Sequence, residues 1–141
     1  MAYSTQDDLL KMVPEEEVAQ LTTDSSEVPD PAVVSEAIAK AGAEIDSYLA
    51  VRYVLPLAAT PAQVKNLAAD MAIYHLYSRR AVMPEIRRQK YEDAVKFLKD
   101  VSAGRAEIVG ASGAEEPGAA SDVTEVSSSP RVFSREKMGD W

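Results

Sequence analysis

Four prolines constrain the fold of this 141-residue chain more than any other feature. After each of them in the sequence, apolar residues recur three and four positions apart, which is the spacing of one face of a helix. Proline suits the first helical position, because its missing N–H is not needed there and its φ angle is already helical. The four positions are Pro14, Pro31, Pro61 and Pro84. The sequence therefore predicts four helices that each begin at a proline.

Capping residues support two of these starts and add a fifth. Asp30 and Thr60 precede their prolines, and their side chains can accept hydrogen bonds from N–H groups at a helix start. Thr60 with Gln63 also forms the pattern of a capping box, in which the third helical residue bonds back to the cap. A further short helix is predicted to begin at Ser4 or Thr5, because acidic residues follow in its first turn.

The three longer helices differ in how much of their surface is apolar. Residues 31–52 and 84–102 each carry one apolar stripe, so each should cover a core with one face. Residues 61–80 are apolar over most of the circumference, which predicts the central, most buried helix. Gly104 is placed to end the last helix in a left-handed conformation, and no convincing strand pattern precedes it. The predicted fold is all-α, a bundle of three long helices preceded by two short helices.

The predicted helical domain covers residues 1–108, and an extended C-terminal arm follows it. Residues 109–130 are mainly glycine, alanine, serine, glutamate and proline, which predicts a flexible linker because little apolar surface is available for burial. Residues 131–141 regain aromatic and basic side chains and are predicted to dock on another chain. A segment that folds back on its own core, or an ordinary ragged terminus, are the alternatives. The expected docking residues are Arg131, Val132, Phe133, Arg135, Met138 and Trp141.

The net charge of −8 is distributed unevenly along the chain. Residues 1–50 hold 11 acids and 2 bases, residues 51–105 hold 5 acids and 10 bases, and residues 106–141 hold 7 acids and 3 bases. These segments are either independent solvated surfaces or complementary faces through which one subunit contacts the next. A contact between two different faces makes a ring when it closes. The candidate inter-subunit residues are Glu36, Glu44, Asp46, Arg52, Arg79, Arg80, Arg87 and Arg88.

No motif in the chain indicates catalysis, a cofactor or a metal. Cysteine is absent, and the one histidine, His75, lies in the most apolar segment without a nucleophile motif nearby. Its ring is therefore expected to be satisfied locally within the core. No acidic or histidine spacing matches a metal site, and we expect no enzyme activity. The polar amino terminus and the absence of a long apolar run predict a soluble, cytoplasmic protein that does not enter a membrane.

Duplex DNA binding is the alternative to a structural role. Several bases cluster around the turn at Pro84, where two helices joined by a short connection could form a helix-turn-helix. The overall acidity of the chain argues against it, because a dedicated DNA-binding protein needs several uncompensated phosphate contacts. The basic residues of this cluster are Arg79, Arg80, Arg87, Arg88 and Lys90.

The stretch "AEIDSYLAVRYVLPL" at residues 43–57 marks a helix-to-loop corner. Leu55 precedes Pro56 and is therefore disfavoured in the helical region, so the helix should stop near Tyr53. Arg52 is expected to cap the last carbonyls of this helix, and Tyr53 is expected to pack its ring under the loop while its hydroxyl stays in water. The alternative places both side chains on a seam between subunits.

Read in order, the chain resembles a family of small phage proteins. The stretches that carry the resemblance are "MAYSTQDDLLKMVPEEEVAQLT", "AEIDSYLAVRYVLPL", "TPAQVKNLAADMAIYHLYSRR" and "RRQKYEDAVKFLKDVSAGRAEI". They are similar to the Mu-like phage small neck protein family, a domain of unknown function that looks related to the helical head–tail connector, or adaptor, proteins of long-tailed phages. The resemblance covers residues 1–108 and continues at residues 131–141.

This resemblance implies a structural virion protein and no catalytic residues. The chain would be one subunit of a dodecameric ring beneath the portal vertex, where it extends the DNA channel and docks the next neck or tail-completion protein. The segment at residues 131–141 would contact the portal or a neighbour. DNA would pass through the ring without specific binding, and the neck would assemble in the host cytoplasm.

Overall fold

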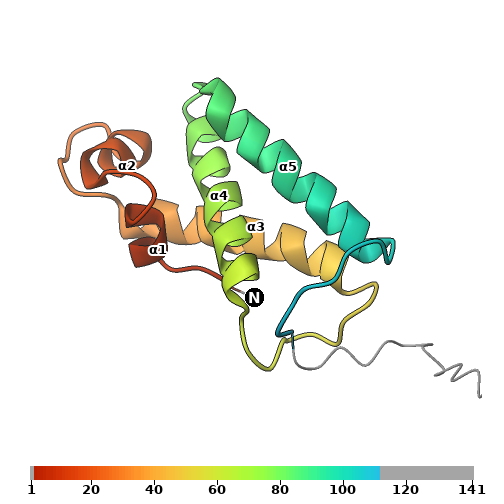
Figure 1. Cartoon of the computed structure of the whole chain (residues 1–141). Coiled ribbons are helices and arrows are strands. Elements are labelled where there is room, and N and C mark those ends of the chain that lie inside the picture. Colours follow the sequence, from red (N-terminus) through yellow and green to blue (C-terminus); the bar gives the residue numbers. More distant parts are fainter. Residues whose placement is uncertain (1, 112–141) are drawn as a thin grey trace, which may run out of the picture.

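The computed structural model describes residues 2–111, which form five helices and no strand (Figure 1). Two short helices at the amino end precede three long ones, as predicted. None of the helices in this described part is long and apolar enough to cross a membrane. The helices are α1 (Gln6–Leu10), α2 (Glu15–Thr22), α3 (Pro31–Leu49), α4 (Ala62–Arg79) and α5 (Glu85–Ser102).

The four prolines mark the helix starts in two different ways. Pro31 is the first helical residue of α3, as predicted. Pro14, Pro61 and Pro84 instead stand one position earlier, as the N-caps of α2, α4 and α5. Their ψ angles lie between 138° and 147°, outside the helical range, while their carbonyl oxygens accept the first helical N–H bonds. The prediction that all four prolines are first helical residues is therefore wrong for three of them.

The predicted caps are correct at two helices and wrong at a third. Thr5 forms a complete capping box with Asp8 at the start of α1, and the Asp30 carboxylate accepts the Ala32 N–H at 2.9 Å. The start of α4 has no side-chain cap, so the capping box predicted for Thr60 is absent. The shift of the N-cap to the following proline removes the threonine from the capping position.

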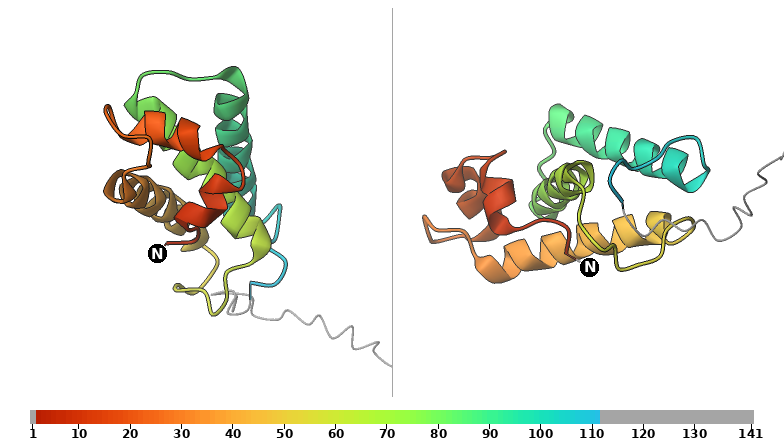
Figure 2. Two further views of the ribbon diagram at one scale, coloured as in Figure 1. Left: turned by 90° about the vertical axis from the view of Figure 1, so that its left-hand side faces the viewer. Right: turned by 60° about the horizontal axis from the view of Figure 1, so that its bottom comes forward.

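Helix α4 is the central helix, as predicted. It packs against α1, α2, α3 and α5, and it lies between α3 and α5 in the right-hand view of Figure 2. Three alanines on its buried surface allow neighbouring helices to approach closely, while larger residues fill the remaining space. The buried residues of α4 are Val64, Ala68, Ala69, Met71, Ala72, Ile73, Leu76 and Tyr77.

The end of α5 is set by Gly104, whose φ angle of +79° is left-handed. The Gly104 N–H donates to the Val101 carbonyl at 3.0 Å, and the Arg105 N–H donates to the Asp100 carbonyl at 2.8 Å, which is a Schellman motif. A side chain at Gly104 would also meet Arg52, because a Cβ at this position would lie 3.1 Å from Nη1 of that arginine. Both the backbone conformation and the space therefore favour glycine at this position.

Candidate functional site

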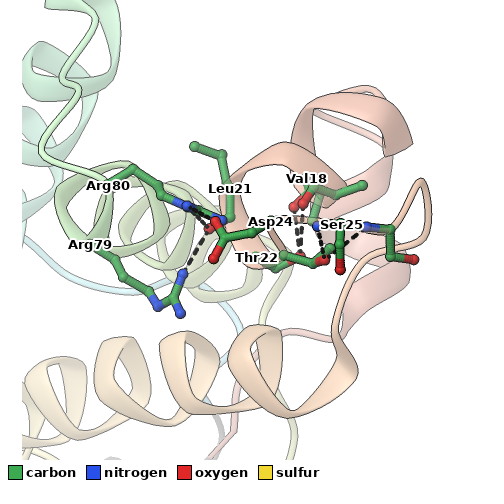
Figure 3. A network of polar contacts seen from close by, with 10 residues as sticks. Val18, Leu21, Thr22, Asp24, Ser25, Arg79 and Arg80 are labelled. Carbon is green, nitrogen blue, oxygen red and sulfur yellow. Dashed lines mark hydrogen bonds and ion pairs between the residues drawn. The ribbon is translucent and has the colours of Figure 1, made fainter.

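Two arginines at the end of α4 hold the carboxyl end of α2 (Figure 3). Nη1 of Arg79 and Nε of Arg80 each donate to the Leu21 carbonyl oxygen at 3.2 Å, and Arg80 also pairs with the Asp24 carboxylate. Positive groups at the carboxyl end of a helix interact favourably with the negative end of its dipole. The hydrogen bond and charge of Arg80 lower the pKa of Asp24. Residues of the acidic segment 1–50 and of the basic segment 51–105 thus meet within one subunit.

Thr22 also fixes the connection from α2 to α3. Its buried hydroxyl donates to the Val18 carbonyl at 2.8 Å and accepts the Asp30 N–H at 3.0 Å (Figure 3 shows the Val18 contact). The same oxygen therefore satisfies groups at the end of α2 and at the cap of α3. This role was not predicted from the sequence, although a threonine at the end of a helix is a recognisable signal for bonding back to a carbonyl.

A polar cluster joins the three long helices where α3, α4 and α5 meet. Nε2 of His75 lies 3.5 Å from Oε2 of Glu44, and the Tyr91 hydroxyl donates to Oε1 of Glu44 at 3.1 Å. Tyr74 stacks on Tyr91, with ring centroids 3.8 Å apart and planes inclined by 10°. Only 8% of the His75 side chain is exposed, and its Nε2 has no hydrogen-bond partner within the described residues.

Burial controls the protonation of this cluster. It lowers the pKa of His75, although the Glu44 carboxylate opposes that shift. Burial, the charge of Glu44 and its hydrogen bond raise the pKa of Tyr91 to about 12. Near neutral pH the cluster therefore contains a neutral imidazole and a protonated phenol. No group of three or more histidines and acids within residues 2–111 is arranged to hold a metal ion.

The Arg52–Tyr53 corner joins α3 to the segment that follows α5. Helix α3 ends at Leu49, somewhat before the predicted end, and Nη1 of Arg52 donates to the Val101 carbonyl of α5 at 3.5 Å. The hydroxyl of Tyr53 accepts the Ile108 N–H at 3.1 Å, and Tyr53 is only 8% exposed. The prediction that this hydroxyl stays in water is therefore wrong, because residues 103–111 return over it.

A shallow hollow of about 290 Å³ lies between α3 and α4. Glu36 and Lys40 border it from α3, and His75 and Arg79 border it from α4. Val33, Ala37 and Leu76 contribute apolar surface. The hollow thus brings together two of the predicted interface residues, Glu36 and Arg79, that are far apart in the sequence.

The family assignment comes from comparison with known proteins. Residues 3–126 match the family model described as "Bacteriophage Mu, Gp36". The chain belongs to this family. The resemblance to a Mu-like phage family is thereby confirmed, and the match covers all five helices.

Two relatives from phage and prophage sources align with this Gp36-family chain. It is 37% identical over 115 residues to "Gene product J" of Escherichia phage Mu, covering 79% of this chain and 77% of that protein. It is 44% identical over 75 residues to "Mu-like prophage FluMu protein gp36" of Haemophilus influenzae, covering 53% of this chain and 52% of that protein. The chain is therefore similar to a phage protein and a prophage protein over half or more of its length.

Of the remaining predicted interface residues of this Gp36-family chain, Asp46 and Arg88 make polar contacts within the subunit. Asp46 accepts a hydrogen bond from the Tyr3 hydroxyl, and burial together with Asp46 raises the pKa of Tyr3. Arg88 pairs with Glu85 on the surface of α5, with 2.6 Å between Nη2 and Oε2. Nη1 of Arg87 is buried without a hydrogen-bond partner in the described chain. Their assignment to a subunit interface remains a prediction.

The predicted docking segment lies outside the described residues. This applies to Arg131, Val132, Phe133, Arg135, Met138 and Trp141, and to residues 112–130 of the predicted linker.

The buried His75 predicts an acid-sensitive stability. Its pKa is lower in the folded chain than the ordinary value of about 6.5, so the folded state binds fewer protons and stability falls as pH drops through that value. Urea denaturation between about pH 7 and about pH 5 should show this loss. His75→Gln should flatten this part of the profile, whereas Gln89→Ala, an exposed change on α5, should keep the wild-type slope. Equal slopes in all three proteins would contradict the assignment.

Proposed function

We propose that this chain is a non-enzymatic structural protein of the phage particle, a head–tail connector subunit in the neck. The observation that carries the proposal is that five of the six large apolar residues exposed in the described chain lie at two opposite ends of a fixed helical body, the sixth being Val28 between α2 and α3. Val82 and Ile86 lie at the α4–α5 turn, and Val51, Val54 and Val109 lie at the other end of these two helices. Large exposed apolar residues that gather on a surface commonly mark contacts with other proteins. A subunit that joins one neighbour above to another below needs two such ends.

The interior of the body supports a structural role. The Glu44, His75 and Tyr91 side chains connect α3, α4 and α5, and Arg79 and Arg80 fix α2 to α4. These groups are used to join helices, which favours a rigid unit over a reactive site. Membership of the Gp36 family, with relatives in phage Mu and a Mu-like prophage, supports a role in the phage particle.

The proposed assembly is a ring of identical subunits, a dodecamer beneath the portal. The excess of acids in residues 1–50 and of bases in residues 51–105 would let different faces of neighbouring copies meet and close the ring. The segment at residues 131–141 would contact the portal or a neighbour, and the next neck or tail-completion protein would bind below. The net charge of −8 would let DNA pass through the channel without adhering.

Imaging of intact particles tests this function directly. The expected result is a ring of five-helix bodies between the portal and the next neck protein, and heads that fail to join tails when the protein is missing. Its absence from assembled particles would overturn the proposal. Duplex DNA binding that falls steeply with salt, and that is weakened by Arg87→Gln with Arg88→Gln, would favour the DNA-binding alternative instead.

A further inference from the structure

Two loops form the end of the molecule opposite the α4–α5 turn. Residues 50–61 connect α3 to α4, and residues 103–111 follow α5; the two segments lie side by side at the bottom of Figure 1 and in both views of Figure 2. The Ile108 N–H bonds the Tyr53 hydroxyl, and Nη1 of Arg52 bonds the Val101 carbonyl. These contacts turn two polar side chains of the first loop inward and fix the loops to each other and to α5.

The outward surface of these loops includes three exposed valines, alongside the exposed Arg105 and Glu107. Val51, Val54 and Val109 are 56%, 59% and 86% exposed, and we call these three residues the apolar end face. Connecting loops run over the protein surface, because burial of their backbone groups would be costly. Three large apolar side chains exposed on two adjacent, fixed loops are therefore available for contact with another segment.

We propose that residues 131–141 of the same chain cover the apolar end face in the free subunit. The described chain ends at this face, because Ala111 is packed against the core and lies two residues beyond Val109. The predicted docking segment supplies matching apolar side chains, including Phe133 and Trp141. Aromatic residues of this kind dominate the free energy of many protein contacts.

The length of the intervening chain allows this contact. Residues 112–130 can span up to about 60 Å when extended, whereas the whole of α4 is about 27 Å long. A tethered segment reaches its site at an effective concentration of about a millimolar, so a segment with a dissociation constant of about 0.1 mM is bound about ten times as often as it is free. A second copy at micromolar concentration cannot compete with that tether. The inference does not depend on ring formation or on the portal.

Trp141 provides the test, because it is the only tryptophan in the sequence. In the full-length protein its fluorescence should be shifted to the blue, and acrylamide should quench it several-fold less than it quenches free tryptophan. Val54→Asp should shift the emission to the red and raise quenching toward the free value. Val82→Asp is the matched control, because Val82 is 57% exposed at the opposite end, and it should leave the Trp141 signal unchanged.

Several results would overturn the inference. Full quenching of Trp141 in the wild-type protein would show that residues 131–141 are free. If Val82→Asp exposed Trp141 and Val54→Asp did not, the segment would instead bind at the α4–α5 turn. Protection that increases with protein concentration would identify a second copy as the host. If Val54→Asp lowers the thermal unfolding midpoint of the protein, the test uses Val109→Asp in its place, because Val109 is the most exposed residue of the apolar end face. A free Trp141 in the subunit together with a normal neck in particles would reject this contact and leave the proposed function intact.

Discussion

Shortening Leu98 to alanine is expected to lower the free energy of unfolding by about 2–5 kcal/mol. This is a large part of the roughly 5–15 kcal/mol by which folded domains are usually stable. Leu98 is fully buried on α5. The buried side of this helix consists of one narrow stripe, Ala94, Leu98 and Val101, so loss of the central and largest side chain leaves a cavity that its small neighbours cannot fill. Urea denaturation monitored by circular dichroism measures the change.

Lys99→Ala is the matched control for this substitution. Lys99 follows Leu98 on the same helix but is exposed, so its removal should change the stability by less than about 0.5 kcal/mol. A cost for Leu98→Ala no greater than that of the control would show that α5 is not held by this stripe. Such a result would also contradict the placement of α5 against α4.

The helices could be predicted from the sequence because their signals are local. Proline, a cap and apolar spacing act within a few residues, so the starts of α2, α3, α4 and α5 were placed at the correct prolines. The distinction between N-cap and first helical residue was missed at Pro14, Pro61 and Pro84, since proline is compatible with both positions through its φ angle.

Long-range contacts account for most of what the sequence did not predict. The hydroxyl of Tyr53 bonds a backbone N–H 55 positions away, and Arg79 bonds a carbonyl 58 positions away. No local pattern specifies such a partner. The expectation that Arg52 caps a helix end was partly correct, because it bonds the carbonyl of Val101 near the end of α5 rather than a carbonyl of its own helix.

The charge pattern shows the same difference between sequence and space. Opposite charges in different segments predict either independent solvated surfaces or faces of neighbouring subunits. In the structure Arg80 and Asp24 pair within one subunit, and Glu44 faces His75 and Tyr91 inside the bundle. A one-dimensional count of charges cannot tell an intramolecular pair from an intermolecular one. Glu36 and Lys40, on the hollow beside α3, are therefore better positioned to test a contact between copies than Glu44.

Truncation after Gly110 is expected to abolish attachment to the portal while the helical body stays folded. All five helices and the buried core from Tyr3 to Ile108 precede this position, so the helical circular dichroism signal should change little. The truncated chain lacks residues 131–141, which supply the aromatic and basic side chains proposed to contact the portal or a neighbour. Sedimentation of purified portal rings with the full-length and truncated proteins measures the loss.

A second variant distinguishes loss of the docking side chains from loss of the linker in this experiment. Full-length protein with Phe133→Ala and Trp141→Ala keeps the length and net charge of the chain but removes both aromatic anchors. It should attach to portal rings as poorly as the truncated chain, and both should self-associate more than wild type because the apolar end face is left uncovered. Truncated protein that still joins portal rings would remove the docking role from residues 131–141. In that case one of the two apolar ends of the helical body would have to make the portal contact alone.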